Sequence, residues 1–235
     1  MKHFFAIALS LVFGAFFLSS CGKKADAPGG ADSTKSAAST QTVNLTPGKY
    51  PIKSGIIHGE SETMGMKGTT TKYFDDYGAK ICEETSTNIT IGSTSVKTNK
   101  VTIIRDGWMT SYEPEKKTGT KMKFAIPANM DFKNMGENMM KDMGIKEAGT
   151  ETILGKECKI YEYSGSEKSM GMTGRSWIFW NVEPMKIDMK AGNMTMNNHV
   201  TSIEENVTIP SDKFEVPGDI KIREVGMNMP PAGRK

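Results

Sequence analysis

A period-two alternation of residue types along most of the chain constrains the fold more than any other feature. Runs rich in Thr, Ile and aromatic residues, such as Ala79–Gly92 and Thr94–Gly107, alternate in polarity. Because successive side chains of a strand point to opposite faces, each run can bury one side. Asp76–Gly78 and Arg105–Gly107 have the composition of tight hairpin corners. The sequence therefore predicts strand after strand joined by short turns.

One segment departs from this alternation and predicts a helix. Between residues 129 and 144, apolar side chains recur at steps of three, four and four with polar residues between them, at Phe132, Met135, Met139 and Met143. Asn129 or Asp131 can cap the start of this helix, and Gly144 can cap its end. Together the patterns predict an α+β fold: a strongly curved antiparallel sheet of about ten strands, a half-open barrel, wrapped around the inserted helix.

The N-terminus has the layout of a secretory signal. A basic start, Met1–His3, precedes an apolar stretch, Phe4–Phe17, that is too short to span a bilayer. The next four residues, Leu18–Cys21, resemble the lipobox of bacterial lipoproteins. That resemblance implies a diacylglycerol on the Cys21 sulfur, cleavage before Cys21 and acylation of the new N-terminus. The alternatives are an ordinary cleaved signal with a chance cysteine, or an uncleaved anchor.

Composition divides the chain into four parts. Residues 22–49 contain almost no large apolar residues and are rich in Gly, Ala, Ser and Thr, which predicts a flexible tether. We therefore expect a lipoprotein signal peptide at 1–20, a lipidated Cys21 with its tether at 21–49, one folded domain at 50–225 and a loose tail at 226–235. Gly22, in place of an Asp after Cys21, favours the outer membrane over the inner membrane of the cell envelope.

Three segments carry a resemblance to a known superfamily. They are "TILGKECKIYEY" (152–163), "SWIFWNVEPMKIDM" (176–189) and "SIEENVTIPSDKFEVPGDIKI" (202–222). These are similar to the carrier and receptor proteins of bacterial lipoprotein sorting and to uncharacterised envelope domains around them. The resemblance implies a half-open barrel with a hydrophobic cavity on one face, closed by helices. It also implies a non-catalytic protein whose partner is an apolar ligand, such as an acyl chain, or a lipoprotein.

Two stretches of the chain look like copies of each other. Gly59–Ile81 aligns without a gap on Gly165–Ile187, which places Met64-Gly65-Met66 on Met170-Gly171-Met172. Residues two apart share a face of a strand, so both methionines of each pair are expected to point the same way. With 18 methionines in 235 residues, the chain is rich in thioethers.

Three interpretations of these methionines remain open. They can fill gaps in an irregular core, with the two copies forming equivalent bends of one sheet. They can line an apolar ligand pocket, for which the candidates are Met64, Met66, Phe132, Met135, Met139, Met143, Met170, Met172, Trp177 and Phe179. As a lesser alternative they can bind Cu(I), since thioethers favour that ion, although His58 and His199 show no recognisable ligand spacing.

The remaining features argue mainly against other classes of function. A net charge of +3 on a mixed surface gives no nucleic-acid footprint. The chain has no Gly-x-Ser-x-Gly, no His-Glu-x-x-His and no phosphate-binding glycine loop, so we expect no enzyme, no cofactor and no catalytic or metal-ligating set. Cys82 and Cys158 can form one disulfide or stay as two buried thiols. Oligomeric state carries no signal in the sequence.

Overall fold

The computed structural model describes residues 50–91, 94–123, 137–166, 169 and 171–225. The chain divides into two compact units, residues 1–40 and 41–235, and all the described residues belong to the second. None of the described helices has the length and apolar character needed to cross a bilayer. The predicted signal, Cys21, the whole predicted tether and the predicted tail at 226–235 lie outside the described residues.

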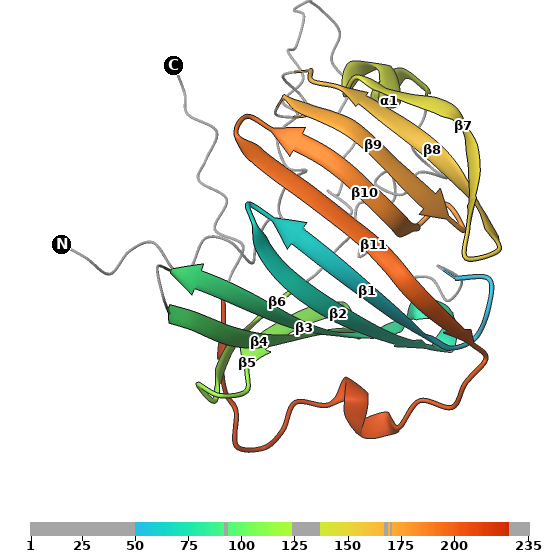
Figure 1. Ribbon diagram of the computed structural model, residues 1–235. Helices are drawn as coiled ribbons and strands as arrows, with labels where there is room; N and C mark the ends of the chain where they lie inside the picture. The colour runs from blue at the N-terminus through green and yellow to red at the C-terminus, as the bar shows by residue number, and fades with distance from the viewer. Residues whose placement is uncertain (1–49, 92–93, 124–136, 167–168, 170, 226–235) are drawn as a thin grey trace, which may run out of the picture. The chain divides into compact units, whose positions relative to one another are not determined.

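The described residues form one twelve-stranded sheet built from two meanders (Figure 1). The first meander contains β1 (Gly55–Thr63), β2 (Met66–Asp75), β3 (Lys80–Ile91), β4 (Thr94–Arg105), β5 (Trp108–Glu113) and β6 (Thr118–Lys123). The second contains β7 (Ile145–Ile153), β8 (Lys156–Ser164), β9 (Met172–Phe179), β10 (Glu183–Ala191) and β11 (Met194–Glu205). The short strand β12 (Lys221–Glu224) completes the sheet.

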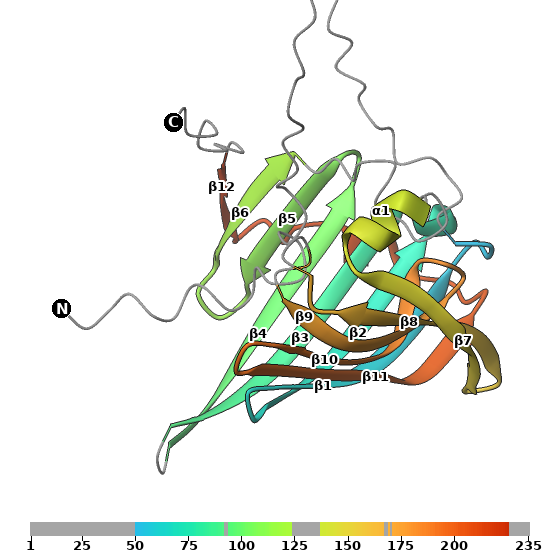
Figure 2. The same ribbon diagram turned by 90° about the horizontal axis from the view of Figure 1, so that it is seen from above.

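A single seam joins the two meanders. β1 pairs antiparallel with β11, so the strand order runs β12-β6-β5-β4-β3-β2-β1-β11-β10-β9-β8-β7. Both views show β1 lying beside β11 (Figures 1 and 2). Every pair is antiparallel except β12 with β6, which is parallel. The sheet is open, with β12 at one edge and β7 at the other.

The predicted α+β fold class is wrong. The structure is nearly all β, the sheet has twelve strands, and no helix is present among the described residues around which it could wrap. The only α-helix in the described part of the chain is α1 (Glu137–Asp142), six residues long, which lies next to the start of β7 (Figure 2). Met143, the last member of the predicted helical stripe, follows α1, whereas Phe132 and Met135 lie outside the described residues. A stripe at helical spacing indicates a local preference, but so few residues cannot support a layer of their own.

A two-residue turn joins β1 to β2 at Met64 and Gly65. Thr63 lies directly opposite Met66, and the two residues between them, Met64 and Gly65, have φ of 52° and 77°. Positive φ at both central residues is the type I′ geometry that matches the twist of a hairpin. Met64 and Met66 therefore do not follow one another along a strand, and the expectation that they share a face as strand neighbours is wrong. Met64 lies in the turn with 57% of its surface exposed.

The C-terminal segment covers the outward side of the first meander. After β11 the chain runs across β2 to β5, forms the short 3-10 helix η4 (Ser211–Phe214) and ends in β12 (Figure 1). Phe214 packs in a cluster with Cys82, Ile103 and Tyr112, all three of which are buried. The Arg105 guanidinium donates to the Phe214 carbonyl at 2.9 Å and holds η4 on the sheet.

Gly174 of β9 is a position where the backbone requires glycine. Its φ is +128°, and a Cβ there would lie 2.1 Å from the carbonyl oxygen of Asp188 in β10. We expect G174A to lower the free energy of unfolding by about 2–4 kcal/mol, through backbone strain and overpacking. G218A is the control, since no atom lies within 4 Å of a Cβ at Gly218. Urea denaturation should show G218A within about 0.5 kcal/mol of the wild type; equal effects of the two variants would contradict this assignment.

Candidate functional site

Methionines from four strands lie on one face of the sheet. Directly paired residues of antiparallel strands point to the same side, and the register pairs Met189 of β10 with Met196 of β11. Thr63 of β1 pairs with Met196 on one side and with Met66 of β2 on the other. Ala191 pairs with Met194 and with Met172. We call this set the methionine face: Met66, Met172, Met189, Met194 and Met196.

Two small residues, Gly174 and Ala191, lie among the methionines of this face. Gly174, which has no side chain, lies directly opposite Met189, and beyond Gly174 the same row reaches Tyr163 of β8. Ala191, with only a methyl group, separates Met172 from Met194. Met172 and Met196 are buried, with 8% and 7% of their surface exposed, whereas the other three members are half-buried. Flexible thioethers therefore dominate this part of the sheet.

The methionine face continues into the cluster beneath α1. Met143 is buried together with Ile145, Tyr161, Tyr163 and Ile178. Met140 of α1 and Met189 of the methionine face both pack against this cluster as half-buried side chains. α1 and the strands thus contribute thioethers to one continuous apolar region.

The structure brings only some of the predicted pocket residues together. Met66, Met143 and Met172 belong to this region, but Trp177 and Phe179 pack elsewhere, with Cys158 and Met185. The remaining candidates cannot be placed, because Phe132, Met135 and Met170 lie outside the described residues and the side chain of Met139 is not described. Met189, Met194 and Met196 were not among the predicted residues. The Met-x-Met spacing at 194–196 could have indicated two of them.

The two cysteines of the folded domain are free thiols. Cys82 is buried against Ile103 and Phe214, and Cys158 against Trp177, in separate clusters. Burial, with a smaller effect of Glu84, raises the pKa of Cys82 to about 12. Burial also raises the pKa of Cys158. Both thiols therefore stay protonated and unreactive at neutral pH, so of the two alternatives the structure has the buried thiols.

A buried charged network, which the sequence did not indicate, lies elsewhere on the sheet. Lys72 of β2 donates to both carboxylate oxygens of Glu183 in β10, at 2.8 and 3.0 Å. The Tyr50 hydroxyl donates to the same carboxylate at 2.8 Å. Glu183 is 2% exposed and Tyr50 1% exposed. The sequence held one signal of this network. Lys72 lies two residues before the buried Phe74, and because residues two apart share a face of a strand, its charge is directed to the buried side.

The network affects the protonation of its members. Burial and the neighbouring carboxylate of Glu183 raise the pKa of Tyr50 well above its ordinary value. Burial by itself lowers the pKa of Lys72, but the attraction of Glu183 and Glu83 and the hydrogen bond to Glu183 outweigh it and raise the pKa. Tyr50 is therefore neutral and Lys72 charged at neutral pH. A network whose hydrogen bonds are satisfied in this way is an element of structure rather than a reactive centre.

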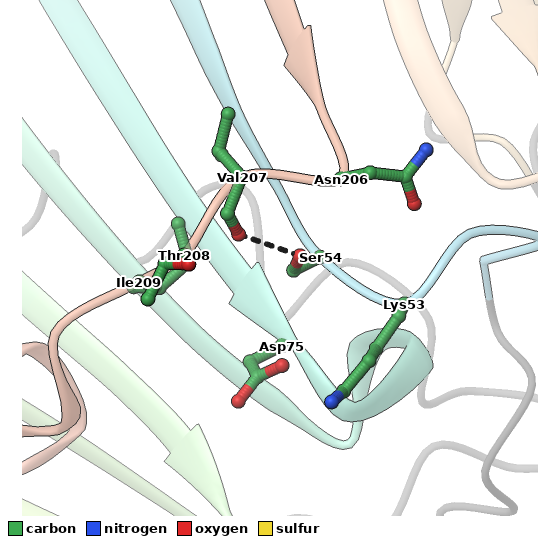
Figure 3. A pocket seen from close by; sticks show the side chains of 7 residues that line it. All are labelled: Lys53, Ser54, Asp75, Asn206, Val207, Thr208 and Ile209. Atoms are coloured by element: carbon green, nitrogen blue, oxygen red, sulfur yellow. Dashed lines mark hydrogen bonds between the residues drawn. The ribbon is translucent and has the colours of Figure 1, made fainter.

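The surface of the described residues has a shallow hollow of about 280 Å³ where the C-terminal segment leaves β11 (Figure 3). The hollow is lined by Lys53, Ser54, Asp75, Asn206, Val207, Thr208 and Ile209. The Ser54 hydroxyl donates to the Val207 carbonyl at 2.7 Å within it, which fastens the segment to the start of β1. Within the described part of the chain, no three His, Cys, Asp or Glu side chains gather as metal ligands.

Comparisons with known proteins give coarse likenesses of fold. No family model and no curated protein matches the chain. The structure is similar to an uncharacterised conserved protein of Thermus thermophilus, with TM-score 0.46 and 9% identity over 74% of this chain and 91% of that one. It is also similar to a β-barrel-like protein of a domain of unknown function from Brucella abortus, with TM-score 0.39 and 8% identity over 66% and 99%.

A third likeness concerns the superfamily indicated by the sequence. A putative outer membrane lipoprotein-sorting protein domain from Vibrio parahaemolyticus gives TM-score 0.32 and 10% identity over 71% of this chain and 91% of that one. At such scores and identities the likeness concerns the course of a curved sheet and carries no information on ligand or activity. The predicted resemblance to lipoprotein-sorting proteins stays a prediction, and the comparison adds only a coarse likeness of fold.

Breaking the buried pair should be costly, and removing both charges should restore much of the loss. E183Q keeps an acceptor for Tyr50 but leaves the Lys72 ammonium without its carboxylate, so we expect a loss of about 2–4 kcal/mol in the free energy of unfolding. The double variant K72M/E183Q should recover at least half of that loss, measured by urea denaturation. E84Q, which breaks the more exposed pair with Lys213, is the control and should cost less than about 1 kcal/mol. An additive double variant would contradict a coupled pair.

Proposed function

We propose that this protein is a lipid-anchored component of the bacterial cell envelope that binds an apolar ligand on the methionine face, beside α1. The ligand class is an acyl chain, free or carried by another lipoprotein. The observation that carries the proposal is the continuity between the methionine face and the cluster beneath α1. The lipobox-like Leu18–Cys21 supports the anchor, and Gly22 favours the outer membrane.

The chemistry of the face suits a chain of variable shape. Thioether side chains are unbranched and polarizable, so they adapt to irregular apolar surfaces and to different ligands. Ala191 presents only a methyl group between Met172 and Met194, so a narrow chain lying there meets less side-chain bulk than elsewhere on the face. Other inward-facing parts of the sheet are less suitable, because the row that begins at Ile57 continues through Lys72, Glu83, Thr102 and Ser111. Because that row is polar, we place the apolar ligand on the second meander.

α1 is a short element that the ligand can displace. A six-residue helix has little stability of its own in water and depends on tertiary contacts. Met140 and Met143 provide such contacts through the cluster that Met189 joins. A chain entering there would replace methionine contacts by contacts of the same kind, at a small net cost in free energy. No arrangement of groups for catalysis accompanies this surface among the described residues, and we propose a binding protein rather than an enzyme.

A charge on the methionine face should prevent ligand uptake. We expect M189E to reduce binding of a fluorescent C16 fatty acid at least tenfold, because a carboxylate in the path of the chain must be desolvated. The measurement is a fluorescence titration of the mature chain carrying C21S, with circular dichroism as the check on folding. M64E is the matched control, since Met64 is exposed in its turn, and it should bind as the wild type does. A folded wild type that takes up no fatty acid would leave the methionines as core packing.

The anchor can be tested separately. We expect cells fed a radiolabelled palmitate to incorporate the label into the wild-type chain and not into C21S, because the thioether-linked diacylglycerol needs the Cys21 sulfur. In a fractionation of the envelope the wild type should follow the membranes and C21S the soluble fraction, since several acyl chains give stable anchoring. C82S is the control and should keep the label. Label retained by C21S would contradict the proposed anchor.

A further inference from the structure

We propose that the methionine face also holds a binding site for a soft monovalent cation, Cu(I), centred on Met189 and Met196. The site is distinct in chemistry from the proposed acyl binding, and it does not depend on it. Its evidence is the row of directly paired residues that crosses six strands, β2, β1, β11, β10, β9 and β8: Met66, Thr63, Met196, Met189, Gly174 and Tyr163.

The register places the first two donors within reach of one ion. Directly opposite residues of antiparallel strands have Cβ atoms about 4.5–5.5 Å apart, and methionine has three rotatable bonds with which to converge on a point between them. Met189 and Met196 are such a pair. Each thioether sulfur can therefore approach a shared ion without a change in the backbone.

Further donors lie around this pair. Met194 is two residues from Met196 on the same face, and so diagonal to Met189. Met143 lies in the cluster against which Met189 packs. On its other side Met189 lies opposite Gly174, where β9 and β10 approach closely, so the two thioethers of the pair are joined by donors from β11 and from the cluster beneath α1.

The donor set determines which ion is preferred. Neutral thioethers are soft ligands that select Cu(I) over harder divalent ions, which need imidazole, thiolate or carboxylate. The thiols and the imidazole of β11 do not join this row: Cys82 and Cys158 lie in other clusters, and His199, three residues from Met196 along β11, points to the opposite face. The site therefore favours Cu(I), and its redox-stable analogue Ag(I), over Zn(II).

The test is a titration of Ag(I) into the mature chain carrying C21S, with the methionine methyl groups labelled with carbon-13. We expect the methyl signals of Met189 and Met196 to move together and to saturate at one equivalent, while that of the exposed Met64 stays in place. M189L/M196L should weaken binding at least tenfold. The titration of the wild-type chain with the C16 fatty acid, run without Ag(I), tests the proposed function by itself, so a failure of this site and a failure of the proposed function are read from different measurements.

The matched control uses a second methionine pair of the same sheet. Met109 of β5 and Met122 of β6 are also directly opposite each other, yet no third methionine is paired with either in the described register. M109L/M122L should leave Ag(I) affinity unchanged. The proposal is overturned if Ag(I) moves no methyl signal at one equivalent, if the shifts spread evenly over all the methionines, or if the control pair weakens binding as much as M189L/M196L.

Discussion

The contact between Lys72 and Glu183 joins two halves of the sheet whose strands are paired along a single seam. The two residues belong to β2 and β10, with β1 and β11 between them in the sheet. In a flat sheet three strand spacings would separate their backbones by about 14 Å. An ion pair at 2.8 Å therefore requires the sheet to curve towards the side that carries it. The position of the methionine face relative to α1 follows from that curvature.

Aromatic packing places this ion pair beside Tyr50. Tyr50, the first described residue, packs against Phe74 and Trp180 with ring centroids 4.4 and 5.7 Å away and donates to Glu183. Phe74 and Trp180 are the residues that correspond in the two similar stretches of sequence, and their rings meet edge-on at 6.4 Å. The similarity of the stretches thus has a structural counterpart: each supplies one wall of the pocket that holds Tyr50.

Local patterns predicted the strands and the turns at Asp76–Gly78 and Arg105–Gly107, since alternation and turn composition depend on neighbouring residues. They could not predict the partners of β1, because nothing in its sequence specifies β11. No sequence pattern predicted the β-bulges either. The bulge between His58 and Gly59 changes which residues of β11 are paired with β1.

The apolar residues at helical spacing led to the wrong fold class, because such a period indicates a preference for helix but does not say how long the helix is. Lys72 and Glu183 gave no pattern, as each is a single charge in a different meander, and the methionine face needed the register of β9 to β11 before its members could be recognised.

The seam has a consequence for the order of events as the chain is made. Each meander is assembled from neighbouring hairpins, which close quickly because their loops are short. In contrast, Gly55 can pair with Glu205 only after most of the polypeptide has been made. The same holds for the packing of Phe214 against Cys82 and Ile103. For most of its synthesis the polypeptide can form hairpins but cannot complete its sheet. A chain with this topology therefore keeps its two meanders unjoined until the residues around Glu205 have been made.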